Sequence, residues 1–314
     1  MTRKRKQSIG KKIFFIFFGV LVTLMLITLG VGTVFYAKLF YSINQTYESV
    51  NRSNVRRTTS IAIEHQTPFS VLLMGIDTGD LGRVEQGRSD TLMVATINPA
   101  DKQTTIVSIP RDTYVEIEGR GTKDKINHAY AFGGAAMAIE TVQNYLDIPI
   151  DYYVSINMQG FKELVDAVGG IEVNNPFTFS QDEHYFSIGK ISLNGDQALT
   201  YSRMRYEDPK GDYGRQERQR KIVEGIVKKV VSFSGVIKYQ RVLKALEEHM
   251  KTDMSFDKIQ KIVLEYRDAF GKVKLDQLKG EGFMQENISY QKVDDQELGR
   301  VQQELKGQLK LEGK

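Results

Sequence analysis

The residues from Ile13 to Tyr36 include no Asp, Glu, Lys or Arg, and this uncharged run is the feature that most constrains the chain. At about 1.5 Å of rise per residue, such a helix would extend about 36 Å, whereas the hydrocarbon core of a bilayer is about 30 Å thick. We therefore expect residues 13–36 to form one transmembrane helix. A cleaved signal peptide is the alternative, but the apolar stretch is too long for one, and no A-x-A-like cleavage site follows it.

The charges on either side of this run predict its orientation in a membrane. Six basic residues precede the run, whereas Lys38 is the only basic residue between the run and Arg52. Lys and Arg concentrate on the cytoplasmic side of a membrane helix. We therefore expect residues 1–12 to be a cytoplasmic tail and the chain beyond the helix to be extracytoplasmic. The six basic residues are Arg3, Lys4, Arg5, Lys6, Lys11 and Lys12.

Charge and composition exclude several classes of function. The chain has a net charge of +4, and because the tail alone supplies +6, residues 13–314 carry −2. A nucleic-acid-binding domain is expected to be basic, so no nucleic-acid partner is expected. The chain has no cysteine, which excludes disulfides and thiolate nucleophiles. Its four histidines are widely separated and lack metal-ligand spacing.

The rest of the chain predicts a stalk and one folded domain. Residues 37–67 are polar and show no sustained apolar period, as in a linker. Within residues 68–314, short branched apolar runs such as SVLLMGI, TLMVATI and TTIVSI suit strands buried on both faces of a sheet. Helical patterns alternate with these strands, which predicts an α/β sandwich with a central mixed sheet. The expected helices span 133–146, 161–168, 211–232, 235–250 and 256–270, residues 91–109 form an expected hairpin, and KVKLDQL and ISYQKV are weaker strand candidates.

Charged residues gather where the expected strands end. Ligands of open α/β sheets bind at the carboxyl ends of the strands, so these residues are candidates for a site. Lys125 and Asn127 precede the start of an expected helix, a position that favours anions. The strand-end residues are Asp77 in VLLMGID, Arg88 and Asp90 in GRSDT, and Arg111 and Asp112 in IPRD.

The expected helix that follows Gly211 predicts an inward-facing arginine. Its apolar stripe is extended toward the N-terminus, in steps of three and four residues, by Gln219 and Arg215. A buried arginine needs an anionic partner, because an unpaired interior charge is costly. Arg218 lies one position off the stripe, which favours exposure to solvent. The stripe consists of Ile222, Val223, Ile226, Val227 and Val230, and the anion is either a ligand or one of Glu207, Asp208 and Asp212.

The residue types favour a phosphate as the ligand. Arginine forks match phosphate oxygens, and two carboxylates together with phosphate oxygens suit Mg²⁺. Five arginines and two strand-end aspartates are more than internal salt bridges readily explain. No Walker motif is present, so a nucleotide is not expected to supply the energy.

Seven motifs, in this order behind an N-terminal anchor, resemble the LytR-CpsA-Psr family. The resemblance covers residues 68–235, whereas residues 236–314 form an extension that supports no residue assignment. It implies an α/β/α fold with a hydrophobic tunnel for a polyprenyl chain, which we expect between the sheet and the helices that include 161–168 and 222–230. The motifs are MGIDTGD, GRSDT, SIPRDTYVEI, KINHAYAFGG, VGGIEV, GDQALTYSRMR and GDYGRQERQ.

The resemblance also implies an activity and its residues. Family members transfer wall glycopolymers, such as teichoic acid, from a polyprenyl pyrophosphate carrier to peptidoglycan at the bacterial cell membrane. The resemblance implies Mg²⁺ or Mn²⁺ binding by Asp77 and Asp90, and it makes these two residues and Arg111 the catalytic candidates. It assigns no ligand contact to Lys125, Asn127, Asp212 or Arg218. The implied pyrophosphate-binding residues are Arg88, Arg111, Arg203, Arg205, Arg215 and Gln219.

Other functions remain open on the sequence alone. Hydrolysis of the same pyrophosphate would differ only in that water replaces the glycan hydroxyl. A membrane-bound transcriptional regulator without catalysis is a role often ascribed to this family, although the charge and the expected topology argue against DNA binding. The sequence does not specify the glycopolymer, the acceptor hydroxyl, the general base or the oligomeric state.

Overall fold

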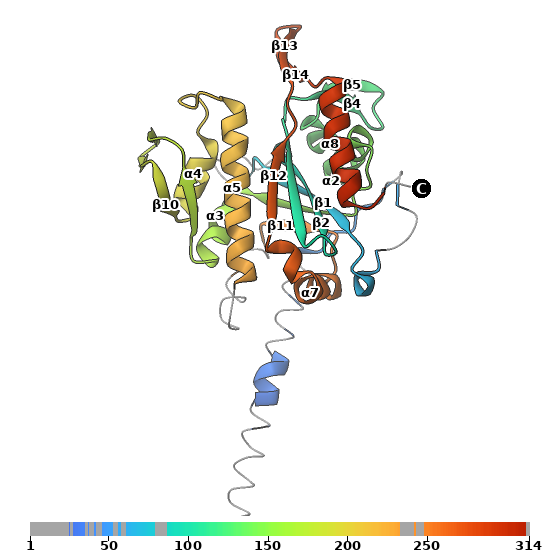
Figure 1. The fold of residues 1–314 in the computed structure, drawn as a ribbon, viewed down its shortest axis with the longest axis vertical. Helices are drawn as coiled ribbons and strands as arrows, with labels where there is room; N and C mark the ends of the chain where they lie inside the picture. Colours follow the sequence, from blue (N-terminus) through green and yellow to red (C-terminus); the bar gives the residue numbers. More distant parts are fainter. Residues whose placement is uncertain are drawn as a thin grey trace, which may run out of the picture. The chain divides into compact units, whose positions relative to one another are not determined.

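The computed structural model divides the chain into two compact units, Met1–Ser42 and Ile43–Lys314. It describes residues 25, 28–34, 37, 41, 46–52, 56–57, 61–78, 87–232, 242 and 248–311 (Figure 1). In the first unit residues 28–34 are helical, and no helix among the described residues is long and apolar enough to cross a membrane. The expected basic tail and most of the expected membrane helix 13–36 lie outside the described residues.

A six-stranded mixed sheet forms the centre of the second unit, as predicted. Its order is β11-β6-β1-β2-β3-β12. Strands β6 and β12 run parallel to β1 and β3, respectively, whereas β2 is antiparallel to both β1 and β3. Strand β11 is antiparallel to β6. The carboxyl ends of β1, β3, β6 and β12 therefore meet at one edge, together with the amino ends of β2 and β11. The strands are β1 (Phe69–Ile76), β2 (Ser89–Asn98), β3 (Gln103–Ile109), β6 (Tyr152–Asn157), β11 (Met250–Thr252) and β12 (Val273–Gln277).

Helices cover both faces of the sheet (Figure 1). On one face α2 (His128–Leu146) and α8 (Asp295–Gln308) pack against a core that includes Leu72, Val94 and Val107. On the other face Val71, Met93 and Ile106 pack with the second group of helices. That group consists of α5 (Asp212–Val231), α7 (Phe256–Glu265), η1 (Ile63–His65) and η2 (Arg267–Phe270).

A third apolar cluster lies beside α5 and joins it to α3, α4 and two small sheets. These elements are α3 (Met158–Ala167), α4 (Gly195–Arg203), β7 (Ile171–Asn175), β8 (Phe179–Gln181), β9 (His184–Phe186) and β10 (Gly189–Leu193). Two further hairpins complete the unit: β4 (Tyr114–Ile117) with β5 (Thr122–Lys125), and β13 (Glu281–Gln285) with β14 (Ile288–Lys292).

Most of the expected elements are present. The predicted hairpin is β2–β3, and both weaker candidates are strands, β12 and β14. The helix expected at 256–270 ends at Glu265 and continues only as the short 3₁₀ helix η2. The helix expected at 235–250 falls largely outside the described residues.

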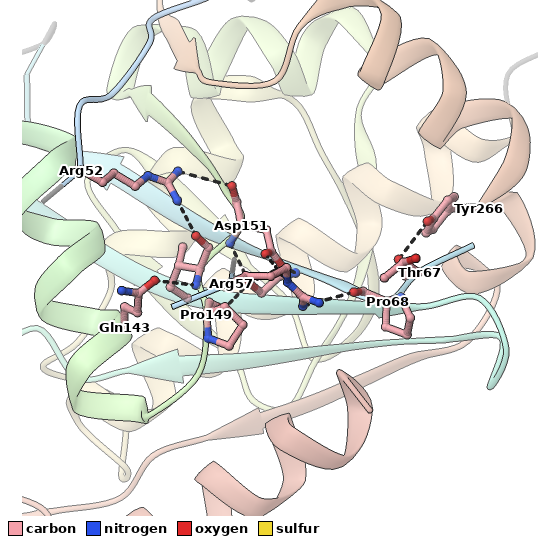
Figure 2. A network of polar contacts seen from close by, with 10 residues as sticks. Arg52, Arg57, Thr67, Pro68, Gln143, Pro149, Asp151 and Tyr266 are labelled. Atoms are coloured by element: carbon pink, nitrogen blue, oxygen red, sulfur yellow. Dashed lines mark hydrogen bonds and ion pairs between the residues drawn. The ribbon is translucent and has the colours of Figure 1, made fainter. Parts of the chain in front are cut away.

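Arg52 and Arg57, which precede β1 in the sequence, are tied to the rest of the second unit by buried ion pairs (Figure 2). Arg57 Nε lies 2.7 Å from Asp151 Oδ1, and the Asp151 side chain is only 4% exposed. Burial raises the pKa of Asp151, and this effect is opposed by Arg57 and by hydrogen bonds from Ser70. Arg52 forms an ion pair with Asp253 and donates to the carbonyl oxygen of Ile150.

The segment that precedes β1 also pairs with the sheet through its backbone. The amide of Glu48 donates to Thr252 O over 2.8 Å, and Tyr47 forms a parallel bridge with Thr252 of β11. Removal of one partner of a buried pair leaves an uncompensated charge, which typically costs about 3–5 kcal/mol. Residues 46–52 and 56–57 of the segment expected as a stalk are therefore bound to the domain.

Candidate active site

The first carboxylate of the site lies where β1 ends. Asp77 follows Ile76, and its backbone amide donates to Arg88 O over 3.1 Å. In return the Arg88 amide donates to Asp77 Oδ1 over 2.6 Å. The two connections to β1 and β2 fix Asp77 at the sheet edge, while the Arg88 residue is exposed.

The second carboxylate lies at the start of β2 and contacts two neighbours. Arg111 Nη1 donates to Asp90 Oδ2 over 2.8 Å, and Asn127 Nδ2 donates to Asp90 Oδ1 over 3.2 Å. Arg111 follows β3, and Asn127 directly precedes α2, so three elements converge on Asp90. Lys125 pairs with the carboxylate that follows Arg111 in the sequence: its Nζ lies 2.7 Å from Asp112 Oδ1.

The first turn of α5 brings a third group of charges to this edge. Arg215 Nη2 lies 2.8 Å from Asp212 Oδ1, and both side chains are 10% exposed. Gln216 donates to the other oxygen of Asp212, and Arg205 Nε lies 3.7 Å from Oδ1. Arg215 is therefore both inward-facing, as its helical position predicts, and paired with one of the carboxylates that we considered.

The electrostatics of Arg215 reflect its neighbours. Burial lowers its pKa, and Asp212 opposes this effect by stabilising the charged form. Arg111 and Arg205 also lower the pKa, whereas Asp90 raises it. These mutual influences place the arginines of three separate motifs in one electrostatic cluster, in which an added anion would relieve repulsion between cations.

Arg218 has a different role from Arg215. Its side chain is only 2% exposed, so the expectation that it faces solvent is wrong. It forms an ion pair with Asp208 and donates from Nε to Tyr201 O over 3.0 Å. Gly214 permits this arrangement, because a Cβ there would lie 1.9 Å from Asp208 Oδ2. The helical stripe alone did not indicate the loop carboxylate that draws Arg218 inward.

Arg220 is a buried cation that the sequence did not single out. It is 5% exposed, and its Nη2 donates to Gln277 Oε1 over 2.7 Å. Within the part of the chain that the structure describes, its Nε and Nη1 make no hydrogen bond. Burial lowers its pKa to about 10. Gln216, one turn earlier on α5, is also buried. The apolar stripe does not mark this side of the helix, so the sequence held no signal for Arg220.

An apolar cavity of about 350 Å³ opens among these side chains. Its polar lining includes Asp77, Asp90, Arg203, Arg215 and Gln219. The cavity lies between the sheet and helices α3 and α5, where we expected it. Val168 and Ile222, by contrast, pack in a filled core cluster. The apolar walls include Leu73, Met93, Val154, Phe161, Leu164, Val223, Ile226 and Val227.

The structure thus brings most of the candidate residues to one place. Arg111 reaches the cavity through its bond to Asp90. Arg205 lies farther out, 3.7 Å from Asp212, which pairs with the cavity-lining Arg215. Among the described residues no group of three or more His, Cys, Asp or Glu could hold a metal ion. Two carboxylates that line one cavity nevertheless suit Mg²⁺, which commonly takes one or two carboxylates and completes its shell with water and phosphate oxygens.

Residues 33–307 match the model of the LytR_cpsA_psr family. The chain belongs to this family. It is 64% identical over 303 residues to a polyisoprenyl-teichoic acid–peptidoglycan teichoic acid transferase, TagU, of Enterococcus faecalis, and the match covers 96% of this chain and 99% of that protein.

Two solved structures share the fold. A crystal structure from Enterococcus faecalis, described as a transcriptional regulator, is 49% identical with a TM-score of 0.72, and covers 80% of this chain and 91% of its own. The structure of TagT bound to LIIa-WTA is 29% identical with a TM-score of 0.71, and covers 84% of this chain and 99% of its own.

The contacts of Arg215 and Arg218 predict different effects of their removal. Arg215→Ala should weaken binding of a polyprenyl pyrophosphate analogue by about 1.5–3 kcal/mol, the value of a charged hydrogen bond. It should lower the stability of the unliganded protein by less than Arg218→Ala does, because Asp212 keeps Gln216 and Arg205 as neighbours. Arg218→Ala should cost about 3–5 kcal/mol of stability, because it strands the buried Asp208.

Thermal melts of both variants, with and without the analogue, measure the two effects. A lower melting temperature of unliganded Arg215→Ala, together with unchanged stabilisation by the analogue, would show that Arg215 is a structural residue.

Proposed function

We propose that this chain is an extracytoplasmic transferase that moves a teichoic-acid-type glycopolymer from a polyprenyl pyrophosphate carrier to peptidoglycan. The observation that carries the proposal is the apolar cavity that opens on Asp77, Asp90, Arg203 and Arg215. A substrate with a long apolar tail and a doubly charged head group needs both parts of this site. The names of the TagU relative and of the TagT complex support the same substrate class.

The proposed reaction is a phosphoryl transfer that breaks the pyrophosphate linkage of the donor. The glycan hydroxyl attacks the phosphorus next to the glycopolymer, and the bond from this phosphorus to the bridging oxygen breaks. Polyprenyl phosphate leaves with the bonding electrons, and the hydroxyl proton passes to a base. The arginines stabilise the negative charge that develops on the leaving phosphate, and the shared site positions the two substrates.

The ion pair between Arg111 and Asp90 gives these residues a place in this scheme. Without substrate, Arg111 neutralises Asp90 over 2.8 Å. A pyrophosphate would compete with Asp90 for the guanidinium of Arg111. The planar fork of N–H donors on arginine matches phosphate oxygens better than the point charge of a lysine does. Asp90 would then be available together with Asp77 to hold Mg²⁺, which supplies further charge neutralisation at the phosphates. Whichever of these carboxylates is not fully engaged with the metal is the candidate base.

Two other activities are weaker candidates. Pyrophosphate hydrolysis needs the same residues, so the acceptor decides between hydrolysis and transfer. Transcriptional regulation matches the description of one related structure. Against it, the net charge of residues 13–314 is −2, whereas binding to DNA depends on neutralising its phosphates with basic residues.

We also propose that the chain crosses the bacterial cell membrane once, with its N-terminus in the cytoplasm. The support is the uncharged run 13–36 behind six basic residues. A reporter active only in the cytoplasm should be inactive when fused after Lys314, and activity there would overturn this topology.

Filling the cavity tests the proposed substrate. Val227 lines the apolar wall on α5, so Val227→Trp should shorten the space available to a lipid tail. We expect at least a tenfold loss of transfer from a long-chain polyprenyl donor. A donor with a short prenyl chain should lose much less, and Val230→Trp, outside the cavity lining, is the control. Equal losses for long and short donors would contradict a lipid-binding cavity.

Removing the metal or its ligands tests the proposed Mg²⁺ site. Asp77→Asn and Asp90→Asn should each lower turnover by at least a hundredfold and abolish its dependence on Mg²⁺, while thermal melts stay close to wild type. Excess EDTA should inhibit the wild-type enzyme, and Mg²⁺ or Mn²⁺ should restore activity. Wild-type rates in EDTA would exclude a divalent cation from the reaction.

A further inference from the structure

The sheet edge that carries the site also carries the β13–β14 hairpin. Strand β12 runs parallel to β3, so its carboxyl end lies at the same edge as Arg111 and Asp77. Only residues 278–280 separate β12 from β13. Figure 1 shows the hairpin projecting past the end of the sheet, at the end where β4 and β5 lie.

Hydrogen bonds hold the base of the hairpin on two sides of the charged cluster. The Tyr213 hydroxyl donates to Gly280 O over 2.7 Å and accepts from Gly280 N over 2.6 Å. On the other side Gln291 N donates to Asp112 O over 2.8 Å. Tyr213 is two residues from Arg215, and Asp112 directly follows Arg111. The hairpin is therefore continuous with both walls of the proposed pyrophosphate site.

One face of the hairpin is covered by aromatic packing. Phe283 and Tyr290 are cross-strand partners whose rings stack 5.6 Å apart. Tyr114 of β4 packs edge-on against both, with centroid distances of 5.5 and 4.9 Å. Because side chains alternate along a strand, Glu281 and Lys292 lie on this same face.

The opposite face of the hairpin is open and uncharged. By the alternation of the strands it consists of Gly282, Met284, Ser289 and Gln291. Met284 is 65% exposed, and Gly282 and Ser289 are exposed as well. A Cβ built on Gly282 would meet no atom closer than Tyr290 O at 4.0 Å. Gln291 is half-buried and its Oε1 is enclosed. The exposed part of this face, formed by Gly282, Met284 and Ser289, therefore offers apolar and hydroxyl groups and open backbone without a charge.

We propose that this open face binds the acceptor, an uncharged N-acetylated glycan strand of peptidoglycan; the proposal rests on the function proposed above. The distribution of charge on the protein assigns the two substrates to different surfaces. The polyanionic donor belongs on the arginine side, whereas an uncharged polysaccharide gains from apolar contact and neutral hydrogen bonds and needs no counter-charge. The hairpin is joined to the site through Tyr213 and Asp112. A glycan strand bound on its open face would therefore extend to the pyrophosphate.

A bulky charge on the open face tests this proposal. In Gly282→Glu the carboxylate must keep its water, which blocks close approach of a sugar ring but clashes with nothing in the fold. Gly299→Glu on α8 is the matched control, because a Cβ there also meets nothing within 4 Å. Met284→Ser removes the exposed apolar contact, and Leu264→Ser, 71% exposed on α7, is its control.

Two readouts of the detergent-solubilised full chain decide the outcome. In transfer assays we expect Gly282→Glu to raise the KM for peptidoglycan at least tenfold and Met284→Ser to raise it several-fold. Both variants should keep the wild-type KM for the lipid-linked donor, and both controls should match wild type. In cosedimentation with purified peptidoglycan sacculi and no donor, Gly282→Glu should lose most of the bound protein.

The cosedimentation separates this proposal from the proposed function. If the wild-type chain transfers nothing but binds sacculi in a manner that depends on Gly282, the docking face stands and the transferase assignment fails. If Gly282→Glu transfers with an unchanged KM for peptidoglycan and cosediments like wild type, the docking proposal is overturned. A raised KM for the donor instead would assign this face to the glycopolymer and would also overturn it.

Discussion

The direction of the strands is the constraint on which the site depends. Because β2 is antiparallel to β1 and β3, β11 is antiparallel to β6, and β6 and β12 run parallel to β1 and β3, four carboxyl ends and two amino ends meet at a single edge. Asp77, Asp90 and Arg111 come together for that reason alone, although up to 34 residues separate them in the sequence. The same edge is where α5 begins and where the β13–β14 hairpin leaves the sheet. Donor chemistry and the proposed acceptor face are thus consequences of one topology.

The number of fixed partners distinguishes structural arginines from those available to a ligand. Arg218 engages each of its three nitrogens, on Asp208 and on the carbonyl oxygens of Tyr201 and Met204, and its side chain is only 2% exposed, so it is closed to a substrate. Arg215 pairs with Asp212, but its buried Nε makes no hydrogen bond among the described residues. A buried donor without a partner costs free energy, and an anion in the adjacent cavity would recover it.

Sequence patterns predicted the parts of the fold that local rules determine. The strands followed from branched apolar runs, the β2–β3 hairpin from the turn residues between two such runs, and the inward direction of Arg215 from helical periodicity. The pattern failed for β13, whose sequence EGFMQ has a glycine and few branched residues and is a strand because it pairs with β14. It also failed for Arg218 and Arg220. Their burial depends on a loop carboxylate in one case and on Gln277 of a distant strand in the other, and neither contact is local.

The cavity and the ion pairs around it together suggest an order of events. An apolar tail can enter the cavity without disturbing any ion pair, since the walls on α3 and α5 are apolar. The head group then meets two arginines that are already neutralised, Arg111 by Asp90 and Arg215 by Asp212. Breaking these pairs offsets part of the binding energy of the head group, but it also frees Asp90 at the moment when the phosphates arrive. Asp90 therefore becomes available for metal and base chemistry only when a donor is present, which limits reaction at an empty site.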